Sequence, residues 1–176
     1  VINLSELLAE TRLDEQQRHL LAGICEGGSA LLQLVNDVLD FSKIEAGKLE
    51  IMPAPFNLRA LLRGLEDLYG KQASEKGLVL EFNLDARLPE MVESDPACVR
   101  QIMQNLLSNA IKFTDRGFIR VSVAPASKEG SAGVVQFTVQ DSGIGIAQEH
   151  LGSLFQEFHQ LDSGLNRRFS GTGLGL

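Results

Sequence analysis

A long run of apolar residues at steps of three and four, from Asp14 to about Ala46, constrains this chain more than any other feature. Such spacing places an apolar stripe along a helix, as in the seam of a helix bundle. Residues 1–10 form the end of an earlier helix, and a two-helix hairpin is too thin to bury the stripe alone. We therefore expect residues 1–50 to be half of a dimeric four-helix bundle. The stripe comprises Leu20, Leu21, Ile24, Leu31, Leu34, Val35, Val38, Leu39, Phe41 and Ile44.

Residues 54–176 change to a mixture of helical and strictly alternating patterns, after a linker marked by Pro53 and Pro55. Alternation of apolar and polar residues predicts strands with one buried face. The fold class is therefore α+β, with a helical hairpin followed by an α/β sandwich whose sheet is mixed and mostly antiparallel. The predicted helices cover 57–76 and 95–114, the predicted strands cover 78–84, 118–124 and 134–140, and a hairpin loop covers 128–133.

The net charge, the hydropathy and the cysteines of the chain limit the kinds of molecule that it can be expected to bind. The net charge of −7 argues against a nucleic-acid surface, which would normally be basic. It does not exclude a nucleotide, because a few local cations and backbone N–H groups can hold phosphates. The sequence has no apolar run long enough to span a membrane, so we expect no membrane contact by this chain. Cys25 and Cys98 fit buried, reduced thiols, which indicates a cytoplasmic location.

Polar side chains form a stripe along the helix that begins at Asp95. Gln101, Asn105, Asn109 and Lys112 recur at spacings of four, four and three. An asparagine amide oxygen can join a Mg²⁺ shell, and a lysine one turn further along could contact a phosphate. A solvated polar face is the structural alternative.

Two glycine-containing segments could approach a ligand closely. Asp141-Ser-Gly-Ile-Gly145 follows an alternating strand, where a carboxylate could accept a hydrogen bond from an exocyclic amine; an ordinary turn is the alternative. Gly171-Thr-Gly-Leu-Gly175 leads into a helical pattern and could present N–H groups to phosphate. The polar stretch 162–170, with Arg167 and Arg168, could form a lid, or only a surface loop.

Together these segments resemble the ATP-binding domain of histidine kinases. Asn105-Leu-Leu-Ser-Asn109-Ala-Ile-Lys112-Phe113 resembles the N box, and residues 141–145 resemble the G1 box. Phe155-Gln-Glu-Phe158 resembles the F box, and residues 171–175 resemble the G2 box. The segment ending Asp40-Phe-Ser-Lys-Ile-Glu-Ala-Gly47 resembles the second helix of the dimerisation and phosphotransfer domain of hybrid sensor kinases.

The resemblance implies the Bergerat ATP fold, with ATP and Mg²⁺ as cofactors. Asp141 would recognise the adenine amine, Asn109 would ligate Mg²⁺ with Asn105 in support, and Lys112 would contact phosphate. Arg167 or Arg168 would reach the γ-phosphate from the lid. The catalytic set is thus Asn105, Lys112, Arg167 and Arg168, and Asn105 and Asn109 are the metal ligands. The nucleotide site would also include Phe113, Gly143, Gly145, Gly171, Thr172, Gly173, Leu174 and Gly175.

Asn105 stands where hydrolysing relatives such as gyrase place a glutamate that activates water. An amide cannot act as a general base, so the site suits transfer of the γ-phosphoryl group to another nucleophile. The family's nucleophile is a histidine in a motif expected upstream of Val1. His19, His150 and His159 lack that context, so we expect this chain alone to be unable to autophosphorylate.

The resemblance also implies partners. These are a second copy of the chain, the receiver domain of a response regulator, and ATP or ADP, and the parent protein could be anchored in an inner membrane. Two alternatives remain open from the sequence. One is a nucleotide-sensing pseudokinase or regulatory dimerisation module, and the other is a hydrolytic ATPase of the same superfamily.

Overall fold

A computed structural model describes residues 2–9, 11–126 and 133–153. These residues divide into two compact units, residues 2–49 and residues 50–153. No helix within the described ranges is long and apolar enough to cross a membrane. Most of the predicted 128–133 loop, the F-box segment, the lid with Arg167 and Arg168, and Gly171–Gly175 lie outside the described residues.

The first unit contains α1 (Ile2–Ala9) and α2 (Glu15–Glu45), as the sequence predicts. Asp14 and Gln17 exchange two hydrogen bonds at the start of α2 and form a capping box. Its carboxylate accepts from the Gln17 amide at 2.8 Å, and the Gln17 side chain accepts from the Asp14 amide at 3.0 Å. This pairing satisfies two amides at the helix start. At the other end Gly47 adopts φ 63°, a left-handed conformation that glycine tolerates without a steric penalty.

The apolar stripe of α2 stays largely in contact with solvent in a single chain. Leu21 is buried, but Leu31 is 63% exposed and Leu39 is 53% exposed. Exposed leucines in a row along a helix indicate an unsatisfied packing surface. The structure of one chain therefore agrees with the prediction that this hairpin cannot bury its own stripe.

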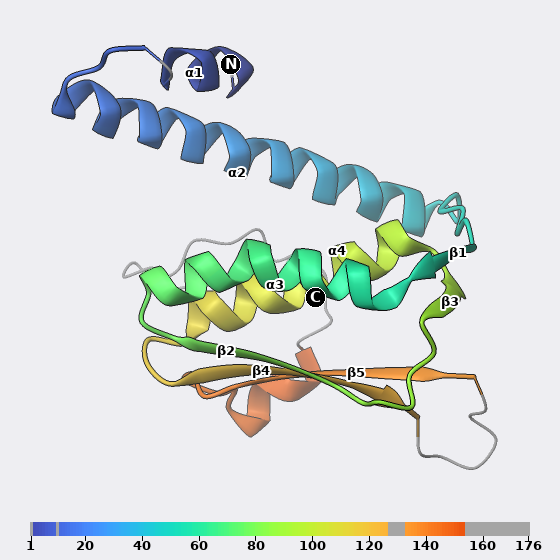
Figure 1. Ribbon diagram of the computed structural model, residues 1–176. Coiled ribbons are helices and arrows are strands. Elements are labelled where there is room, and N and C mark those ends of the chain that lie inside the picture. The colour runs from blue at the N-terminus through green and yellow to red at the C-terminus, as the bar shows by residue number, and fades with distance from the viewer. Residues whose placement is uncertain (1, 10, 127–132, 154–176) are drawn as a thin grey trace. The chain divides into compact units, whose positions relative to one another are not determined.

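The second unit is a layered α/β domain. Its helices are α3 (Leu58–Glu75) and α4 (Pro96–Phe113), and a 3₁₀ helix, η1 (Gln148–Ser153), follows the last described strand. Its strands are β1 (Ala54–Asn57), β2 (Val79–Leu84), β3 (Met91–Ser94), β4 (Phe118–Pro125) and β5 (Val135–Asp141). In Figure 1, α3 and α4 cover one face of the sheet formed by β2, β4 and β5.

Strand pairing is mixed. The three-stranded sheet has the order β2-β4-β5, in which β2 is parallel to β4 and β5 is antiparallel to β4. A parallel pair needs a crossover, and α4 lies on the crossover between β2 and β4. The predicted fold class, a helical segment followed by a mixed α/β domain, is confirmed.

The core lies between the two helices and the sheet. The alternation predicted for residues 78–84 holds, since Leu80, Phe82 and Leu84 all pack against the buried cluster. Each side chain of this size contributes roughly 1.5–3 kcal/mol when fully buried. The largest completely buried apolar members come from both helices and from β4, and they are Leu58, Leu62, Leu65, Met103, Leu107, Ile119, Val121 and Val123.

Two features differ from the sequence prediction. Residues 54–57 and 91–94 form a short antiparallel pair, β1 with β3, whereas the sequence predicts a linker around Pro53 and Pro55 and no strand at 91–94. The buried face of α4 is also rotated. Steps of three and four in the sequence predict an apolar stripe of Val99, Ile102, Met103, Leu106, Ala110 and Phe113 on this helix. Ile102 is 59% exposed, whereas Leu107, which is not in that stripe, is completely buried.

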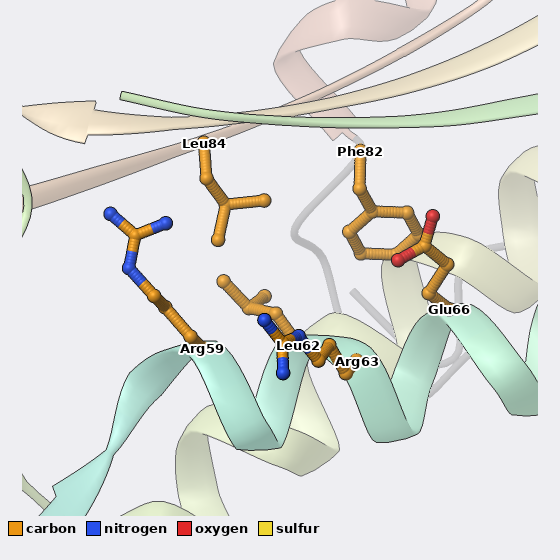
Figure 2. Close-up of a pocket in the computed structure, with 6 residues that line it drawn as sticks. All are labelled: Arg59, Leu62, Arg63, Glu66, Phe82 and Leu84. Carbon is orange, nitrogen blue, oxygen red and sulfur yellow. The ribbon is translucent and has the colours of Figure 1, made fainter. Parts of the chain in front are cut away.

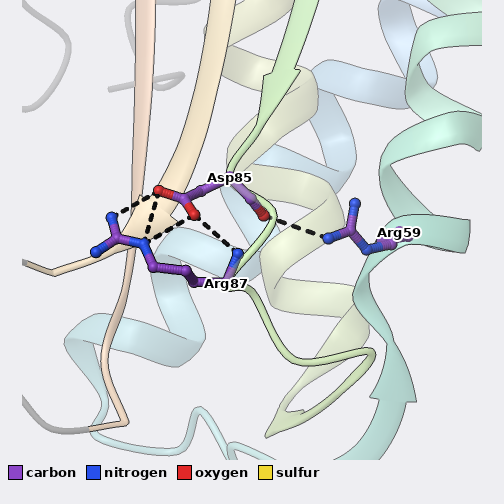
Figure 3. A network of polar contacts seen from close by, with 3 residues as sticks. All are labelled: Arg59, Asp85 and Arg87. Carbon is purple, nitrogen blue, oxygen red and sulfur yellow. Dashed lines mark hydrogen bonds and ion pairs between the residues drawn. The ribbon is translucent and has the colours of Figure 1, made fainter.

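The turn after β2 is fixed by an ion pair (Figure 3). The Arg87 guanidinium donates to both carboxylate oxygens of Asp85, with Nη2 2.7 Å from Oδ2 and Nε 3.0 Å from Oδ1. These hydrogen bonds hold the pKa of Asp85 at about 2. Arg59 on α3 donates to the Asp85 carbonyl at 3.3 Å, which links the turn to the helix layer.

Candidate functional site

The N-terminus of α4 is fixed by one buried carboxylate. Asp95 accepts from the amides of Ala97 at 2.9 Å and Cys98 at 3.1 Å, and Pro96 occupies the first turn. A cap of this kind satisfies amides that have no partner within the helix. The same carboxylate accepts from the Met52 amide at 2.9 Å, so it also ties the linker before β1 to α4.

The predicted polar stripe of α4 is half-buried toward the C-terminal end of the helix. Gln101 is exposed, whereas Asn105, Asn109 and Lys112 are each partly covered. Burial lowers the pKa of Lys112 below its ordinary value, because removal from water disfavours the charged ammonium. Its Nζ lies 4.9 Å from the centre of the Phe113 ring, in a cation–π contact.

The end of β5 presents the carboxylate of Asp141. This residue is exposed, and its Oδ1 accepts from the Gly143 amide at 2.8 Å in a tight turn. Gly143 leaves no room for a side chain. An added Cβ would collide with the Phe113 carbonyl oxygen and lie 2.8 Å from Asp141 Oδ1. The glycine predicted from the sequence is therefore required by close backbone approach.

The end of α4 and the loop after β5 meet directly. The Ile144 amide donates to the Phe113 carbonyl at 3.3 Å, so the 141–145 loop is attached to the last turn of the helix. Ser142 ties the same loop to the start of β4, because its Oγ accepts from the Phe118 amide at 2.9 Å and its own amide donates to the Phe118 carbonyl at 3.1 Å. Gly117 lies between the end of α4 and the start of β4 and adopts φ 116°. A Cβ added to it would collide with Ser142 Oγ.

The structure thus brings together the elements that carry the first two predicted motifs. Asn105, Asn109 and Lys112 lie on a helix whose end contacts the loop that holds Asp141 and Gly143. Gly145 follows in that loop with φ 68°.

Sequence reasoning missed two residues at this junction. Ser142 holds the loop after β5 to the start of β4. The only sequence feature that could have indicated this role is its position between Asp141 and Gly143. Thr114 is completely buried after Phe113, and its Oγ1 has no hydrogen-bond partner within the described part of the chain.

A separate cavity of about 290 Å³ lies between α3 and β2 (Figure 2). Its lining includes Arg59 and Arg63 from the helix and Phe82 and Leu84 from the strand. It contains none of the predicted site residues. The strand that carries it, β2, is at the opposite edge of the described sheet from β5, so this cavity is distinct from the candidate site.

The residue types on α4 and in the 141–145 loop suit an anionic nucleotide with a hard cation. Within the described ranges there is no cluster of three His, Cys, Asp or Glu side chains that could hold a metal alone. Mg²⁺ usually keeps several waters and takes phosphate oxygens with few protein ligands, so amide oxygens from Asn105 and Asn109 fit such a shell. Lys112 supplies a partly desolvated cation, and Asp141 supplies an acceptor that its turn holds in place.

Comparison with known proteins gives concordant matches. The family model described as histidine kinase-, DNA gyrase B- and HSP90-like ATPase matches residues 94–176, and the His kinase A (phospho-acceptor) domain matches residues 1–47. Hybrid signal transduction histidine kinase B of Dictyostelium discoideum is 43% identical over 176 residues, all of this chain. The signal transduction histidine-protein kinase BarA of Escherichia coli K12 is 40% identical over the same length.

These relatives are much longer. The chain spans 9% of the Dictyostelium protein and 19% of BarA. Among solved structures, full-length ShkA in complex with AMPPNP aligns with a TM-score of 0.76 and 34% identity, covering 99% of this chain and 35% of that chain.

Proposed function

This chain belongs to the histidine kinases of two-component signalling, and on that premise we propose that it binds ATP with Mg²⁺ and supplies the catalytic part of a protein-histidine kinase. The observation that carries the proposal is the attachment of the 141–145 loop to the last turn of α4 through Ile144 and Phe113. That attachment supports the proposal, because it joins the loop that begins at Asp141 to the last turn of the helix that carries Asn105, Asn109 and Lys112.

Each residue has a defined part in this proposal. Asp141 accepts the adenine amine, since Gly143 engages only its Oδ1. Asn109 and Asn105 hold Mg²⁺, which when bound neutralises charge on the phosphate oxygens. Lys112 binds phosphate, and the burial that lowers its pKa also strengthens its attraction to an anion. Phe113 and the glycines at 143 and 145 shape the adenine end of the site.

The residues beyond Ser153 complete the proposal. Gly171, Thr172, Gly173, Leu174 and Gly175 cradle the phosphates with backbone amides, and Arg167 or Arg168 contacts the γ-phosphate. This part rests on the G2-box resemblance and on the match of the ATPase family model through residue 176.

Asn105 directs the chemistry toward transfer rather than hydrolysis. A carboxamide cannot accept the proton of an attacking water, so the γ-phosphoryl group remains for a histidine nucleophile. The proposed route then passes the phosphoryl group to the aspartate of a response-regulator receiver, with the helical unit forming a homodimer. The match of the phospho-acceptor family model to residues 1–47 supports this arrangement.

Two measurements test the proposal. Calorimetric titration of this chain with ATP and Mg²⁺ should show saturable binding with one nucleotide per chain. A longer form of the protein that includes the predicted upstream histidine should become labelled by γ-labelled ATP, whereas this chain should not. Binding without labelling in the longer form would favour the pseudokinase alternative, and rapid phosphate release by this chain would favour the hydrolytic one.

A further inference from the structure

Lys76, outside all the recognised motifs, contacts the end of the helix that carries the candidate site. It is the C-cap residue of α3, and its Nζ donates to the Ile111 carbonyl at 2.6 Å and to the Lys112 carbonyl at 3.2 Å. These carbonyls belong to the last turn of α4, where backbone acceptors have no partner within the helix. A single ammonium therefore satisfies two of them.

The next carbonyl along the chain is bound by the candidate site itself. The Phe113 carbonyl accepts from the Ile144 amide, in the loop that begins at Asp141. Three consecutive carbonyls of α4 are thus held from two sides, residues 111 and 112 by α3 and residue 113 by the 141–145 loop. Any shift of this last turn would move the Lys112 side chain and the loop together.

Electrostatics favours a cation at this position. The C-terminus of a helix carries partial negative charge on its unpaired carbonyls, and an ammonium there is stabilising. A second contact sets the alignment of the two helices, because the Tyr69 hydroxyl, about two turns before Lys76, donates to the Gln104 carbonyl at 3.4 Å. The Lys76 contact is the shorter and the charged one, so it is expected to dominate.

We infer that Lys76 is a positioning residue for the nucleotide site, which fixes the last turn of α4 so that Lys112 and the Phe113–Ile144 junction meet the ligand in one geometry. This inference rests on the proposed function. It assigns to Lys76 an effect on the nucleotide site that is exerted through the last turn of α4. The Lys76 ammonium donates to these two backbone carbonyls, so its proposed effect on the ligand passes through the last turn of α4.

The test compares Lys76→Met, which keeps the aliphatic stem and removes the donor, with Lys76→Arg, which keeps a cationic donor. Lys71→Met is the matched control, because Lys71 lies on the same helix, its side chain is 82% exposed, and its ammonium pairs with Glu75 at 3.9 Å within the described part of the chain. Calorimetry with ATP and Mg²⁺ should show Lys76→Met weakening affinity by about three- to tenfold, equivalent to about 0.7–1.4 kcal/mol. Lys76→Arg should recover most of the loss, and Lys71→Met should match the unchanged chain.

Hydrogen exchange in the nucleotide-free chain gives a second readout. The Ile144 amide should exchange faster in Lys76→Met than in Lys71→Met, because its acceptor turn is no longer held. A lower melting temperature with unchanged ATP affinity and unchanged Ile144 exchange would overturn the inference and leave Lys76 a stabilising cap only. If the unchanged chain does not bind ATP, the proposed function fails, and the positioning role fails with it. Should Lys76→Met not fold, Lys76→Gln replaces it in both measurements.

Discussion

At the scale of single residues, the carboxylate of Asp141 and the absent side chain of Gly143 determine what the loop after β5 can bind. Asp141 is exposed, yet its Oδ1 is fixed by the Gly143 amide. A carboxylate held in this way can accept a ligand amine without losing rotamer freedom on binding. The loop is therefore organised before any ligand arrives.

Asp141→Asn is expected to weaken ATP binding, because a neutral amide would replace the charged carboxylate that we propose accepts the adenine amine. The loss should be about 1.5–3 kcal/mol, the range for hydrogen bonds to charged groups. Calorimetry measures it, with Asp67→Asn on the exposed face of α3 as the control for loss of one negative charge. Equal affinity in the variant and the unchanged chain would remove Asp141 from the site.

Gly143→Ala is expected to abolish or strongly weaken ATP binding, because its Cβ would collide with the Phe113 carbonyl oxygen. Relief requires the loop to leave the end of α4, with a stability loss of about 1–3 kcal/mol, as for overpacked cores. Thermal unfolding and calorimetry check both effects. Gly70→Ala on α3 is the control, since nothing lies within 4 Å of its added Cβ; it should retain binding and be slightly more stable.

At the scale of secondary-structure elements, α4 is the element that connects the core, the linker and the candidate site. Its buried face packs in the core through Met103 and Leu107, and its start is capped by Asp95. Its last turn receives hydrogen bonds from Lys76 and Ile144. A helix fixed at both ends can hold amide side chains in a constant position relative to the loop after β5.

The cap at Asp95 makes stability depend on pH. Hydrogen bonds from the Met52 amide, and then from the Cys98 amide, lower the pKa of Asp95 below its ordinary value. The folded state therefore binds the proton more weakly than the unfolded state does. The resulting stabilisation is fully present above the unfolded pKa, about 3.9, and is lost as the pH falls through the lower folded value.

Asp95→Asn should remove this contribution. Denaturant unfolding at pH 7 should show a less stable variant, and the difference from the unchanged chain should shrink as the pH falls below about 4. Asp85, whose pKa is about 2, titrates in both proteins and cancels in the comparison. A stability difference that stays constant down to pH 2 would show that the carboxylate charge of Asp95 is not the source.

At the scale of the whole molecule, the helical unit requires a partner for its apolar stripe. Leu31 is 63% exposed and Val35 is 44% exposed in the single chain. Each leucine-sized side chain that is buried gains roughly 1.5–3 kcal/mol, which is enough to drive association when several act together. The match of the phospho-acceptor family model to residues 1–47 agrees with a second copy as that partner.

The chain is therefore expected to dimerise in solution through α2. Leu31→Asp combined with Val35→Asp should weaken the dimer by at least about tenfold, because each change leaves a charge in an apolar seam. Sedimentation equilibrium across a concentration series measures this, with the exposed Asn36→Asp as the charge control. A monomer at all concentrations in the unchanged chain would contradict the prediction, while leaving ATP binding by the second unit testable.

The sequence by itself determined the features that depend on local periodicity and capping. Helices 2–9, 15–45, 58–75 and 96–113 begin and end near their predicted limits, and in the structure Asp14, Asn57 and Asp95 cap the last three through their side chains. Alternation likewise predicted β2, β4 and β5. The candidate residues up to Gly145 could also be named from the sequence, because the asparagines recur along one face of a helix and the glycines directly follow a strand.

Only the tertiary structure decided the features that depend on contacts between distant segments. The four-residue strands β1 and β3 are too short to show a pattern and form only by pairing with each other. Ile102 faces solvent and Leu107 faces the core because the sheet and α3 select which face of α4 is covered. Lys76 acquires its part in the site for the same reason, since its two carbonyl acceptors lie 35 and 36 residues away and no local pattern can reveal them.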